Sequence, residues 1–579
     1  MKQRCKDFQA KVVGHIRYIY PDKDIEAIAQ SLLVAMQLDT KCKKVKPYID
    51  HWDQTDVIAI SYGDSIKKTG EKPLKTLHRF FDAHLKGVIE GIHILPFFPY
   101  SSDDGFSVID YQQVNNSLGD WSDIEAIAND YKLMSDLVIN HCSSQSEWFE
   151  RFKQNKVPEN EYFIDLDPQT DLSSVTRPRT NPLLREVETP NGLKHVWCTF
   201  SHDQVDLNFA NPNVLIEMVK IIHFYLQRGV KIFRLDAVAF LWKEIGTSCL
   251  NLAKTHEIVR LLRLLIEHNK PQTVIITETN IPNRENLAYF GNSNEAHVIY
   301  NFALPPLLLH GLITGKESYL NNWLMSMPPA QDGTTYLNFI ASHDGIGLRP
   351  VEGILSEDEI TQMVDAMKTF GGEISWRSLS DGEVRPYEIN ISLFSALGGT
   401  VKGLDQWAID RFLCAHIIML GLEGIPAFYI HSLLSTENDY EKLKRTDHSR
   451  SINRHSWSEE ELNKALADGK SHHHFVFNKL KEVINTRKKQ AAFHPNATQY
   501  TLHLGEGVFG FWRQSRNRQQ SVFCIHNISD QTISISRQNI NLIQTEQWID
   551  LLQNNPIDEL SDEFSLEPYQ CMWLTNKCD

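Results

Sequence analysis

The chain has 579 residues, of which 42% are hydrophobic and 23% are charged, and both fractions are ordinary for globular proteins. This composition excludes a disordered chain, a collagen and a small disulfide scaffold. The formal net charge of −15 argues against nucleic acids and membrane surfaces as partners. Small anions stay compatible with this charge, because a local cluster of arginines can bind them.

The termini and the cysteines predict a cytoplasmic protein. The first twenty residues, MKQRCKDFQAKVVGHIRYIY, lack the apolar core of a signal peptide. No run of 18 apolar residues occurs that would span a bilayer. The nine cysteines are odd in number and form no CxxC pair, which favours reduced thiols.

In chain order, the pattern begins with a helical extension over residues 1–50, with helical periodicity around 25–36. Seven short apolar runs follow, each bounded by turn or polar residues: 57–62, 91–98, 133–141, 229–238, 273–279, 336–344 and 424–430. Strands this apolar are buried on both faces, which favours a parallel sheet. Helical stretches lie between them, for example 214–227 and 255–268, so the rhythm predicts repeated β/α units.

The spacing of polar residues favours a (β/α)8 barrel, in which the carboxyl ends of the strands carry the chemistry. Asp236 and Glu278 are 42 residues apart, the size of one unit, and Glu278 and Asp344 are 66 apart, roughly two units. The 100 residues between Asp136 and Asp236 are too many for one unit and predict an insertion.

The predicted organisation is therefore a TIM barrel with additions. The catalytic barrel spans 51–142 and 209–494, and an inserted B subdomain after the third strand spans 143–208. From 495 to 579 the residues alternate between apolar and polar, as in YTLHLGEGVFGFWRQ and QSVFCIHNIS, which predicts a C-terminal antiparallel β domain.

Two carboxylates stand out at predicted strand ends. Asp236 follows Arg234 by two residues in FRLDAV, so both side chains face the same side of a strand. The arginine favours an ionised aspartate, which suits a nucleophile. Glu278 ends an apolar strand, where burial raises the pKa and suits a general acid/base. Such a pair flanking a glycosidic bond is the machinery of glycoside cleavage.

Two further motifs complete the set, namely DLVINH, which ends in His141, and IASHDGIG, which contains His343 and Asp344. In this order, DLVINH, FRLDAV, ITETN and ASHDG resemble the four motifs of the α-amylase superfamily, glycoside hydrolase family 13. QVDLN at 204–208 resembles its additional motif. The resemblance implies a nucleophile, an acid/base and a transition-state stabiliser at Asp236, Glu278 and Asp344. It also implies glucose contacts by Arg234, His141 and His343.

A narrower resemblance is to the sucrose phosphorylase branch, through HILPFFPYSSDDGF, FALPPLLLH, SHDGIG and INRH. It implies that Asp103 and Arg454 bind glucose hydroxyls and that Phe106 forms an apolar wall. It also implies phosphate contacts by Arg179 in TRPRTNPLL and Tyr387 in RPYEIN. The branch implies an α-glucoside and inorganic phosphate as partners, no metal and no cofactor, and leaves a homodimer open.

The acceptor side departs from that branch. Residues 385–388 read RPYE instead of Asp-x-Tyr-Gln, Thr279 and Asn280 replace a valine and a histidine, and Phe240 replaces a tyrosine. HWDQTDV, DPQTDLSSVTRPR, ETNIP and RPYEIN are more similar to glucosylglycerate phosphorylases, whose leaving group is the anion D-glycerate. This resemblance implies that Arg179, Arg385 or Arg177 receives the glycerate carboxylate and that Glu388 accepts a hydrogen bond from a glycerate hydroxyl.

Other functions stay open at this level. They are phosphorolysis of sucrose or of glucosylglycerol, and hydrolysis or transglucosylation of a sucrose-type α-glucoside. A non-catalytic amylase-like subunit is disfavoured, because such proteins typically lack catalytic carboxylates and this chain has Asp236, Glu278 and Asp344.

Overall fold

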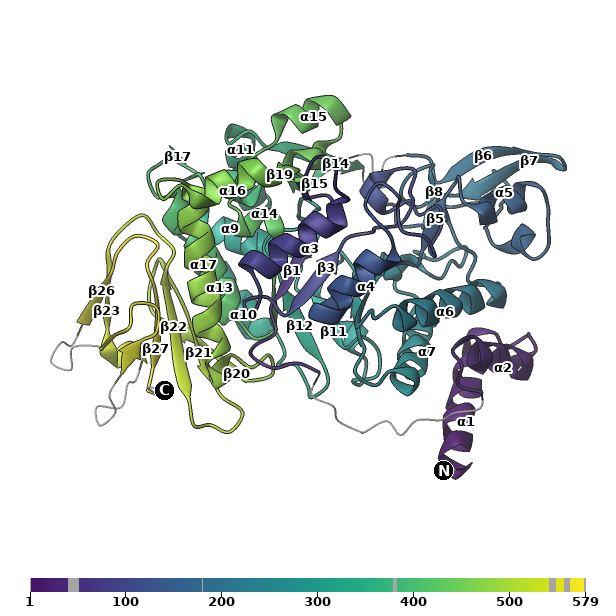
Figure 1. Cartoon of the computed structure of the whole chain (residues 1–579), viewed down its shortest axis with the longest axis horizontal. Helices are drawn as coiled ribbons and strands as arrows, with labels where there is room; N and C mark the ends of the chain where they lie inside the picture. Colours follow the sequence, from purple (N-terminus) through teal and green to yellow (C-terminus); the bar gives the residue numbers. More distant parts are fainter. Residues whose placement is uncertain are drawn as a thin grey trace.

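Eight parallel strands close into the predicted barrel (Figure 1). The computed structural model describes residues 2–39, 51–179, 181–378, 383–540, 548–556 and 563–576. Around the barrel the strands follow the order β1, β3, β4, β9, β10, β11, β12 and β18, and β18 pairs with β1. Their bounds are β1 Ile58–Ser61, β3 Gly91–Ile94, β4 Lys132–Val138, β9 Ile232–Asp236, β10 Val274–Thr277, β11 Val298–Tyr300, β12 Thr335–Asn338 and β18 Ile425–Tyr429.

Each of the seven predicted apolar runs overlaps one barrel strand, so the predicted barrel is confirmed. The eighth strand, β11, lies in the interval of roughly two units between Glu278 and Asp344. It has only three residues, too few for a recognisable apolar run. Helices pack outside the strands: α3 Pro73–His84, α4 Trp121–Asp130, α6 Pro212–Gln227, α7 Ala253–Asn269, α9 Leu304–Thr314, α10 Ser318–Ser326, α13 Ala408–Gly421 and α17 His472–Lys488.

The segments that extend the barrel at the carboxyl ends of its strands follow β4 and β12. After β4, β5 (His141–Ser143) pairs with β8 (Gln204–Asp206), and between them lie α5 (Glu147–Lys153) and the hairpin β6 (Leu184–Thr189) and β7 (Gly192–Trp197). After β12, the sheet β13 (Ile346–Gly347), β15 (Val384–Asn390) and β14 (Glu373–Ser378) forms beside α11 (Glu357–Thr369). Both groups lie along the upper side of the molecule in Figure 1.

The chain then returns past the same end of the barrel before the C-terminal sheet. This stretch holds α14 (Ile430–Leu433), α15 (Tyr440–Thr446), the short 3-10 helix Ser449–Asn453 and α16 (Glu459–Ala467). Beyond it lies the predicted antiparallel sheet, in the order β20, β21, β22, β27, β24 and β25. The bounds are β20 Thr498–His503, β21 Val508–Gln514, β22 Ser521–Asn527, β24 Ile549–Asp550, β25 Asn555–Pro556 and β27 Cys571–Thr575, with β23 Ile533–Ser536 and β26 Glu563–Leu566 forming a separate pair.

Buried arginines join this sheet to the barrel. Arg513 of β21 donates to Gly421 O (2.7 Å), and Arg487 of α17 donates to Leu420 O (2.8 Å). The two guanidiniums therefore satisfy backbone carbonyls near the end of α13, where no intrahelical donor is left for them.

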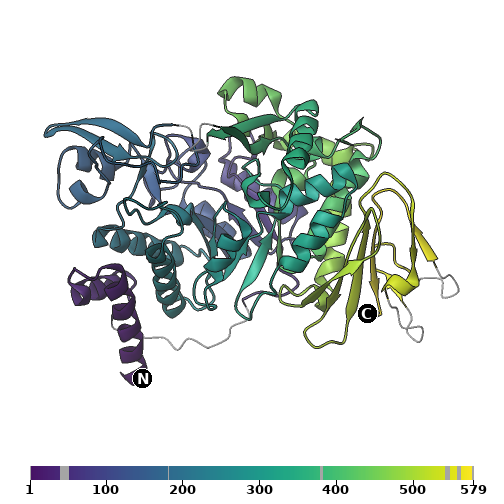
Figure 2. The ribbon, with the colours of Figure 1, turned by 180° about the vertical axis from the view of Figure 1, so that it is seen from behind.

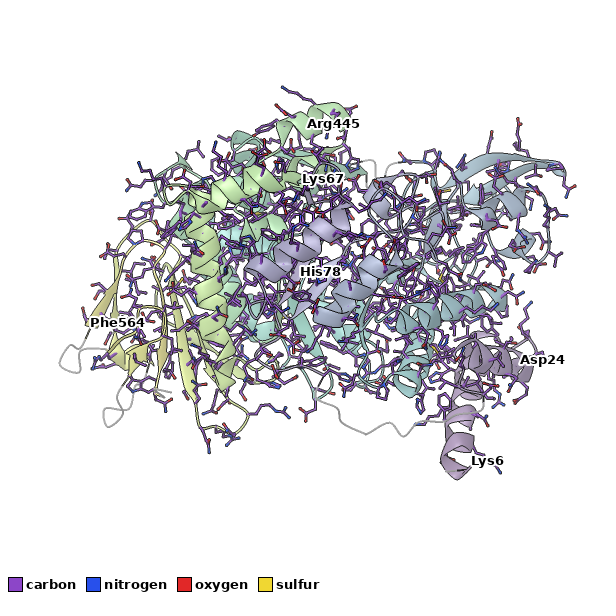
Figure 3. The ribbon with its side chains drawn as sticks, viewed as in Figure 1. Lys6, Asp24, Lys67, His78, Arg445 and Phe564 are labelled. Atoms are coloured by element: carbon purple, nitrogen blue, oxygen red, sulfur yellow. The ribbon has the colours of Figure 1, made fainter. Side chains whose placement is uncertain are left out.

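Two helices precede the barrel and pack against its outside. α1 (Lys2–Ile19) and α2 (Ile25–Ala35) lie near α6 and α7, at the opposite side of the molecule from the C-terminal sheet, as the rear view in Figure 2 also shows. Asp24, labelled in Figure 3, begins α2 by accepting a hydrogen bond from Ala27 N (3.1 Å). Within the described residues, no helix is both long enough and apolar enough to cross a membrane.

Candidate active site

A cleft of about 1360 Å³, open to solvent, lies at the carboxyl ends of the barrel strands. Most of the predicted site residues line it, from elements far apart in sequence. These are Asp103, Phe106, His141, Arg179, Arg234, Asp236, Phe240, Glu278, Asn280, His343, Asp344, Tyr387 and Glu388. Three predicted residues do not line it: Arg177, Arg385 and Arg454.

At the base of the cleft, one guanidinium contacts three carboxylates. Arg234 Nη1 donates to Asp236 Oδ1 (2.7 Å) and to Asp136, which lies beside it on β4. Arg234 Nη2 lies 3.9 Å from Glu278 Oε2, which also accepts a hydrogen bond from Ala237 N (3.0 Å). This confirms that Arg234 and Asp236 share one side of β9. It also gathers the two predicted catalytic carboxylates around one cation.

The charges of this group predict different protonation states for its carboxyls. Burial raises the pKa of both Asp236 and Glu278; repulsion by Asp136 adds to this rise at Asp236, and repulsion by Asp236 adds to it at Glu278. Arg234 opposes this most strongly at Asp236, to which it donates directly, while Glu278 lies farther from its nitrogens. We therefore assign the proton of the pair to Glu278 and the negative charge to Asp236.

Asp344 occupies the loop after β12 and is held by an arginine that the sequence motifs did not single out. Arg450 Nη1 lies 2.6 Å from Asp344 Oδ1, and Arg450 Nε donates to Glu388 Oε1 (2.9 Å). Although burial opposes ionisation, Arg450 and its cationic neighbours lower the pKa of Asp344 far below its usual range. A usable signal was present, because Arg450 stands four residues before Arg454 in HSRSINRH.

Aromatic and imidazole groups form the adjoining wall. The Phe106 ring stacks on His343, with centroids 5.0 Å apart and planes inclined by 6°. His141 Nε2 lies 2.9 Å from Phe106 O, so this nitrogen carries a proton. Burial lowers the pKa of His141 and brings that of His343 to about 3, so both rings are neutral near pH 7. Asp103 accepts a hydrogen bond from Gln204 Nε2 (3.2 Å), which places it at the same wall.

Arg454 does not line the cleft, and the glucose contact expected of it stays a prediction. Its guanidinium is almost fully buried behind the cleft, where Nη1 lies 2.6 Å from Asp104 Oδ2 and Nε donates to His343 O (2.8 Å). The arginine pairs with Asp104 and not with Asp103, which is left facing the cleft. Arg454 therefore positions the loop that carries His343.

The acceptor side of the cleft contains Arg179, Tyr387, Phe240 and Asn280. The Arg179 guanidinium lies 5.7 Å from the centroid of the Tyr387 ring. Phe240 meets Phe200 edge to face, with centroids 5.3 Å apart. Asn280 Oδ1 is buried and has no hydrogen-bond partner among the described residues, so it can accept a hydrogen bond from a ligand.

Three predicted acceptor contacts have other partners. Arg385 lies outside the cleft and pairs with Glu357 (2.8 Å) and Glu383 (3.5 Å). A register shift between β14 and β15 opposite Tyr387 breaks the alternation of faces, so Arg385 does not follow Tyr387 into the cleft. Glu388 lines the cleft, but its carboxylate accepts hydrogen bonds from Arg450 and Gly345 N. Arg177 is exposed and donates to Asn181 O.

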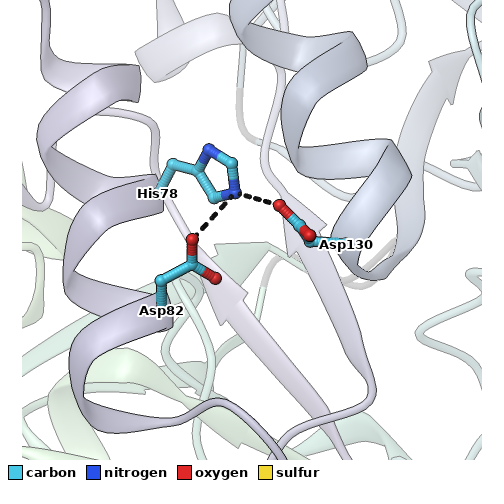
Figure 4. A group of neighbouring side chains, drawn as sticks. All are labelled: His78, Asp82 and Asp130. Carbon is cyan, nitrogen blue, oxygen red and sulfur yellow. Dashed lines mark hydrogen bonds and ion pairs between the residues drawn. The ribbon is translucent and has the colours of Figure 1, made fainter.

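One group of three possible metal ligands occurs among the residues that the structure describes, and it lies on the outer surface. His78 and Asp82 of α3 face Asp130 at the end of α4 (Figure 4), with His78 Nε2 2.9 Å from Asp130 Oδ2. Lys86 Nζ lies 3.7 Å from Asp82 Oδ1 and 4.0 Å from Asp130 Oδ1. The group is thus an ion-pair contact between two helices.

Two buried carboxyls gathered at the carboxyl end of a (β/α)8 barrel suit the cleavage of a glycosidic bond, and comparison with known proteins agrees. Residues 84–337 match the model of the α-amylase catalytic domain. The chain belongs to this family, glycoside hydrolase family 13, and is an enzyme of it.

Two curated relatives are similar to this chain over most of its length. The chain is 44% identical to a glucosylglycerate phosphorylase of Spirochaeta thermophila, over 90% of each chain. It is 38% identical to a glucosylglycerate phosphorylase of Escherichia coli, over 99% of this chain and 100% of the relative. The crystal structure of a sucrose 6F-phosphate phosphorylase from Thermoanaerobacter thermosaccharolyticum shares the fold, with a TM-score of 0.72 and 24% identity over 89% of this chain and 98% of the other.

Proposed function

We propose that the enzyme cleaves 2-O-α-glucosylglycerate with inorganic phosphate, giving α-glucose 1-phosphate and D-glycerate. The observation that carries this proposal is an arginine in the cleft that pairs with no carboxylate. Arg179 lines the same cleft as Asp236 and Glu278, and it has no ion pair among the described residues. An uncompensated guanidinium beside the catalytic pair suits an anionic acceptor, and the two curated relatives above are named for this reaction.

The proposed mechanism is a double displacement with retention at the anomeric carbon. Asp236 attacks this carbon while Glu278 gives its proton to the departing glycerate oxygen, so the glycosidic bond breaks and a glucosyl ester forms. A phosphate oxygen then attacks the same carbon, its proton passes to Glu278, and the Asp236 carboxylate is released. Asp344, kept ionised by Arg450, stabilises the positive charge that develops on the sugar ring.

The remaining wall residues supply binding without acid–base chemistry. His141 and His343 are neutral near pH 7 and serve as hydrogen-bonding groups for the glucosyl unit. Phe106 offers an apolar face, and Asp103 accepts hydrogen bonds from sugar hydroxyls. We propose that the cleft side with Arg179 and Tyr387 receives the acceptor. We also propose a cytoplasmic location, supported by six described cysteines that are buried free thiols.

Reverse synthesis tests the proposed reaction. The enzyme is incubated with glucose 1-phosphate and, separately, with D-glycerate, glycerol, fructose or fructose 6-phosphate, and phosphate release is measured. We expect release with D-glycerate to exceed that with each other acceptor. Fructose as the best acceptor would make the enzyme a sucrose phosphorylase, and glycerol would make it a glucosylglycerol phosphorylase. Donor cleavage that proceeds undiminished without phosphate would instead identify a hydrolase.

A further inference from the structure

The arginines around the cleft fall into two groups by the partners that they have. Arg234, Arg450 and Arg454 each contact a carboxylate within 2.7 Å. Arg179 and Arg349 also line the cleft, yet neither has an ion pair or hydrogen bond with a side chain among the described residues. The paired arginines organise protein carboxylates, while the unpaired ones leave positive charge available to a ligand.

Arg349 was not anticipated from the sequence and is the second residue after β13. Leu348 N donates to Tyr387 O (3.0 Å), which fixes this turn against β15. Arg349 Nε is buried and unpartnered. The Arg179 guanidinium lies over the ring of the same tyrosine. Tyr387 therefore meets Arg179, from the segment after β4, with its ring, and it is bound through its carbonyl oxygen to the residue before Arg349, in the segment after β12.

In the proposed reaction, one anion subsite is occupied twice, first by glycerate and then by phosphate. With retention by double displacement, glycerate leaves from the face of the anomeric carbon that phosphate later attacks. The two acceptors therefore occupy the same side of the cleft in turn, and both are anions. Arg179 and Arg349 are partly exposed, and the Nε atom of Arg349 is buried without a partner, so both can pair with an anion that enters the cleft.

We infer that Arg349 is a specificity-determining residue that forms, with Arg179, a single anion subsite for the carboxylate of glycerate and for phosphate. This inference rests on the proposed function for its glycerate half. Arg349 takes the role that the sequence motifs had offered to Arg385, because Arg385 points to Glu357 and Glu383 outside the cleft. A planar guanidinium can bind either a carboxylate or a phosphate through two parallel hydrogen bonds.

The test compares Arg349→Gln with Arg385→Gln, a matched change of an arginine outside the cleft. In reverse synthesis from glucose 1-phosphate, kcat/KM is measured with D-glycerate and with glycerol, which lacks the carboxylate. For Arg349→Gln we expect the preference for glycerate over glycerol to fall at least about tenfold, the loss of a good charge-assisted contact. Arg385→Gln is expected to keep the wild-type preference.

A second assay tests the phosphate half without glycerate. With α-glucosyl fluoride as donor, the dependence of glucose 1-phosphate formation on phosphate gives a KM for phosphate. Arg349→Gln is expected to raise this KM at least about tenfold. Arg349→Lys keeps the positive charge but lacks the planar guanidinium, so its KM for phosphate is expected to lie between the values of Arg349→Gln and the wild type.

The outcomes separate this inference from the proposed function. Wild-type enzyme with no preference for glycerate would refute the proposed function, while the phosphate assay would still test Arg349. A normal glycerate preference and a normal phosphate KM in Arg349→Gln would overturn the inference and leave the proposed function standing. A change in only one of the two would refute a shared subsite.

Discussion

At the residue scale, the site is governed by the contacts of one cation. Arg234 meets Asp136, Asp236 and Glu278, so three carboxyls compete for one positive charge in a buried setting. His93 Nε2 lies 2.7 Å from Asp136 Oδ2 and helps to keep Asp136 ionised, with its pKa lowered to about 2 despite burial. The remaining excess of negative charge is relieved when Glu278 holds a proton. An acid and a nucleophile thus arise from two similar carboxyls.

The first prediction concerns the proton of Glu278. Glu278→Gln should lower phosphorolysis by about 10²- to 10⁴-fold, the usual contribution of a general acid/base. Fluoride leaves without a proton, so the variant should still form the glucosyl ester from α-glucosyl fluoride, and azide should release it as a glucosyl azide. Product analysis checks this result. Azide rescue in Asp236→Ala instead of Glu278→Gln would reverse the two roles.

The second prediction is a pH dependence with a fixed sign. Burial and the charge of Asp236 raise the pKa of Glu278 above the usual value for a glutamic acid, about 4.3. Below the raised pKa the acid form is present, and as the pH rises through it the proton is lost and kcat/KM for the glucoside should fall. The pH profile with α-glucosyl fluoride, measured for ester formation, should lack this alkaline limb. An alkaline limb of equal position with both donors would contradict the assignment.

At the element scale, the pairing of β13 with β15 brings the acceptor wall to the catalytic loop. Ile346 pairs with Ile389 and Gly347 with Glu388, so Gly345 sits against the β15 backbone. Its amide donates to Glu388, which in turn holds Arg450 against Asp344. Through these contacts, the backbone amide of Gly345 helps to hold Arg450 in place beside Asp344.

The third prediction follows from the space at Gly345. A Cβ there would lie 2.5 Å from Ile389 O and 2.6 Å from Glu388 Oε1, so Gly345→Ala must displace β15 or Glu388. We expect a loss of about 1–3 kcal/mol in the free energy of unfolding and a lower kcat, because Arg450 would shift away from Asp344. Denaturant unfolding and steady-state kinetics check both. Gly469→Ala, where a Cβ meets nothing within 4 Å, is the control. Wild-type kcat in Gly345→Ala would contradict the contact chain.

The same scale explains which features could be predicted from sequence. Apolar runs and strand-end carboxylates depend on local pattern, and they located seven barrel strands together with Asp236 and Glu278. The strand β11 was not predicted, because three residues are too few to show a periodic apolar pattern. Arg385 was predicted for the acceptor side because its sequence motif does not reveal the register shift between β14 and β15, which turns this residue away from the cleft. Arg450 likewise depends on a tertiary contact with Asp344.

At the scale of the whole molecule, the net charge of −15 contrasts with the local charge at the acceptor side. The overall field repels anions, while Arg179 and Arg349 leave positive charge unpaired within the cleft. Their field is strongest at short range, because salt screens exposed charges beyond about 8–10 Å. Small anions are therefore selected at the cleft and polymeric anions are disfavoured by the surface.

The last prediction concerns the N-terminal helices as part of the barrel's cooperative unit. Their apolar faces belong to one continuous core with the barrel, and Ile16 of α1 is fully buried in it. Tyr20 donates its hydroxyl proton to Phe209 O (2.8 Å), and Asn269 Nδ2 donates to Met36 O (2.7 Å), so polar contacts also join the two parts. The lining of the cleft includes no residue before Asp103. Stability and substrate binding should therefore respond separately to changes in α1.

We expect Ile16→Ala to lower the free energy of unfolding by about 2–5 kcal/mol, the cost of emptying a buried isoleucine site, while KM for the glucoside stays at the wild-type value. Urea unfolding is followed by residual activity, so that the midpoint reports the barrel itself. Val34→Ala, at a position 53% exposed on α2, should leave the midpoint unchanged. An unchanged activity midpoint in Ile16→Ala would mean that the helices detach before the barrel unfolds, since only a shared cooperative unit transmits the loss in α1 to the catalytic strands.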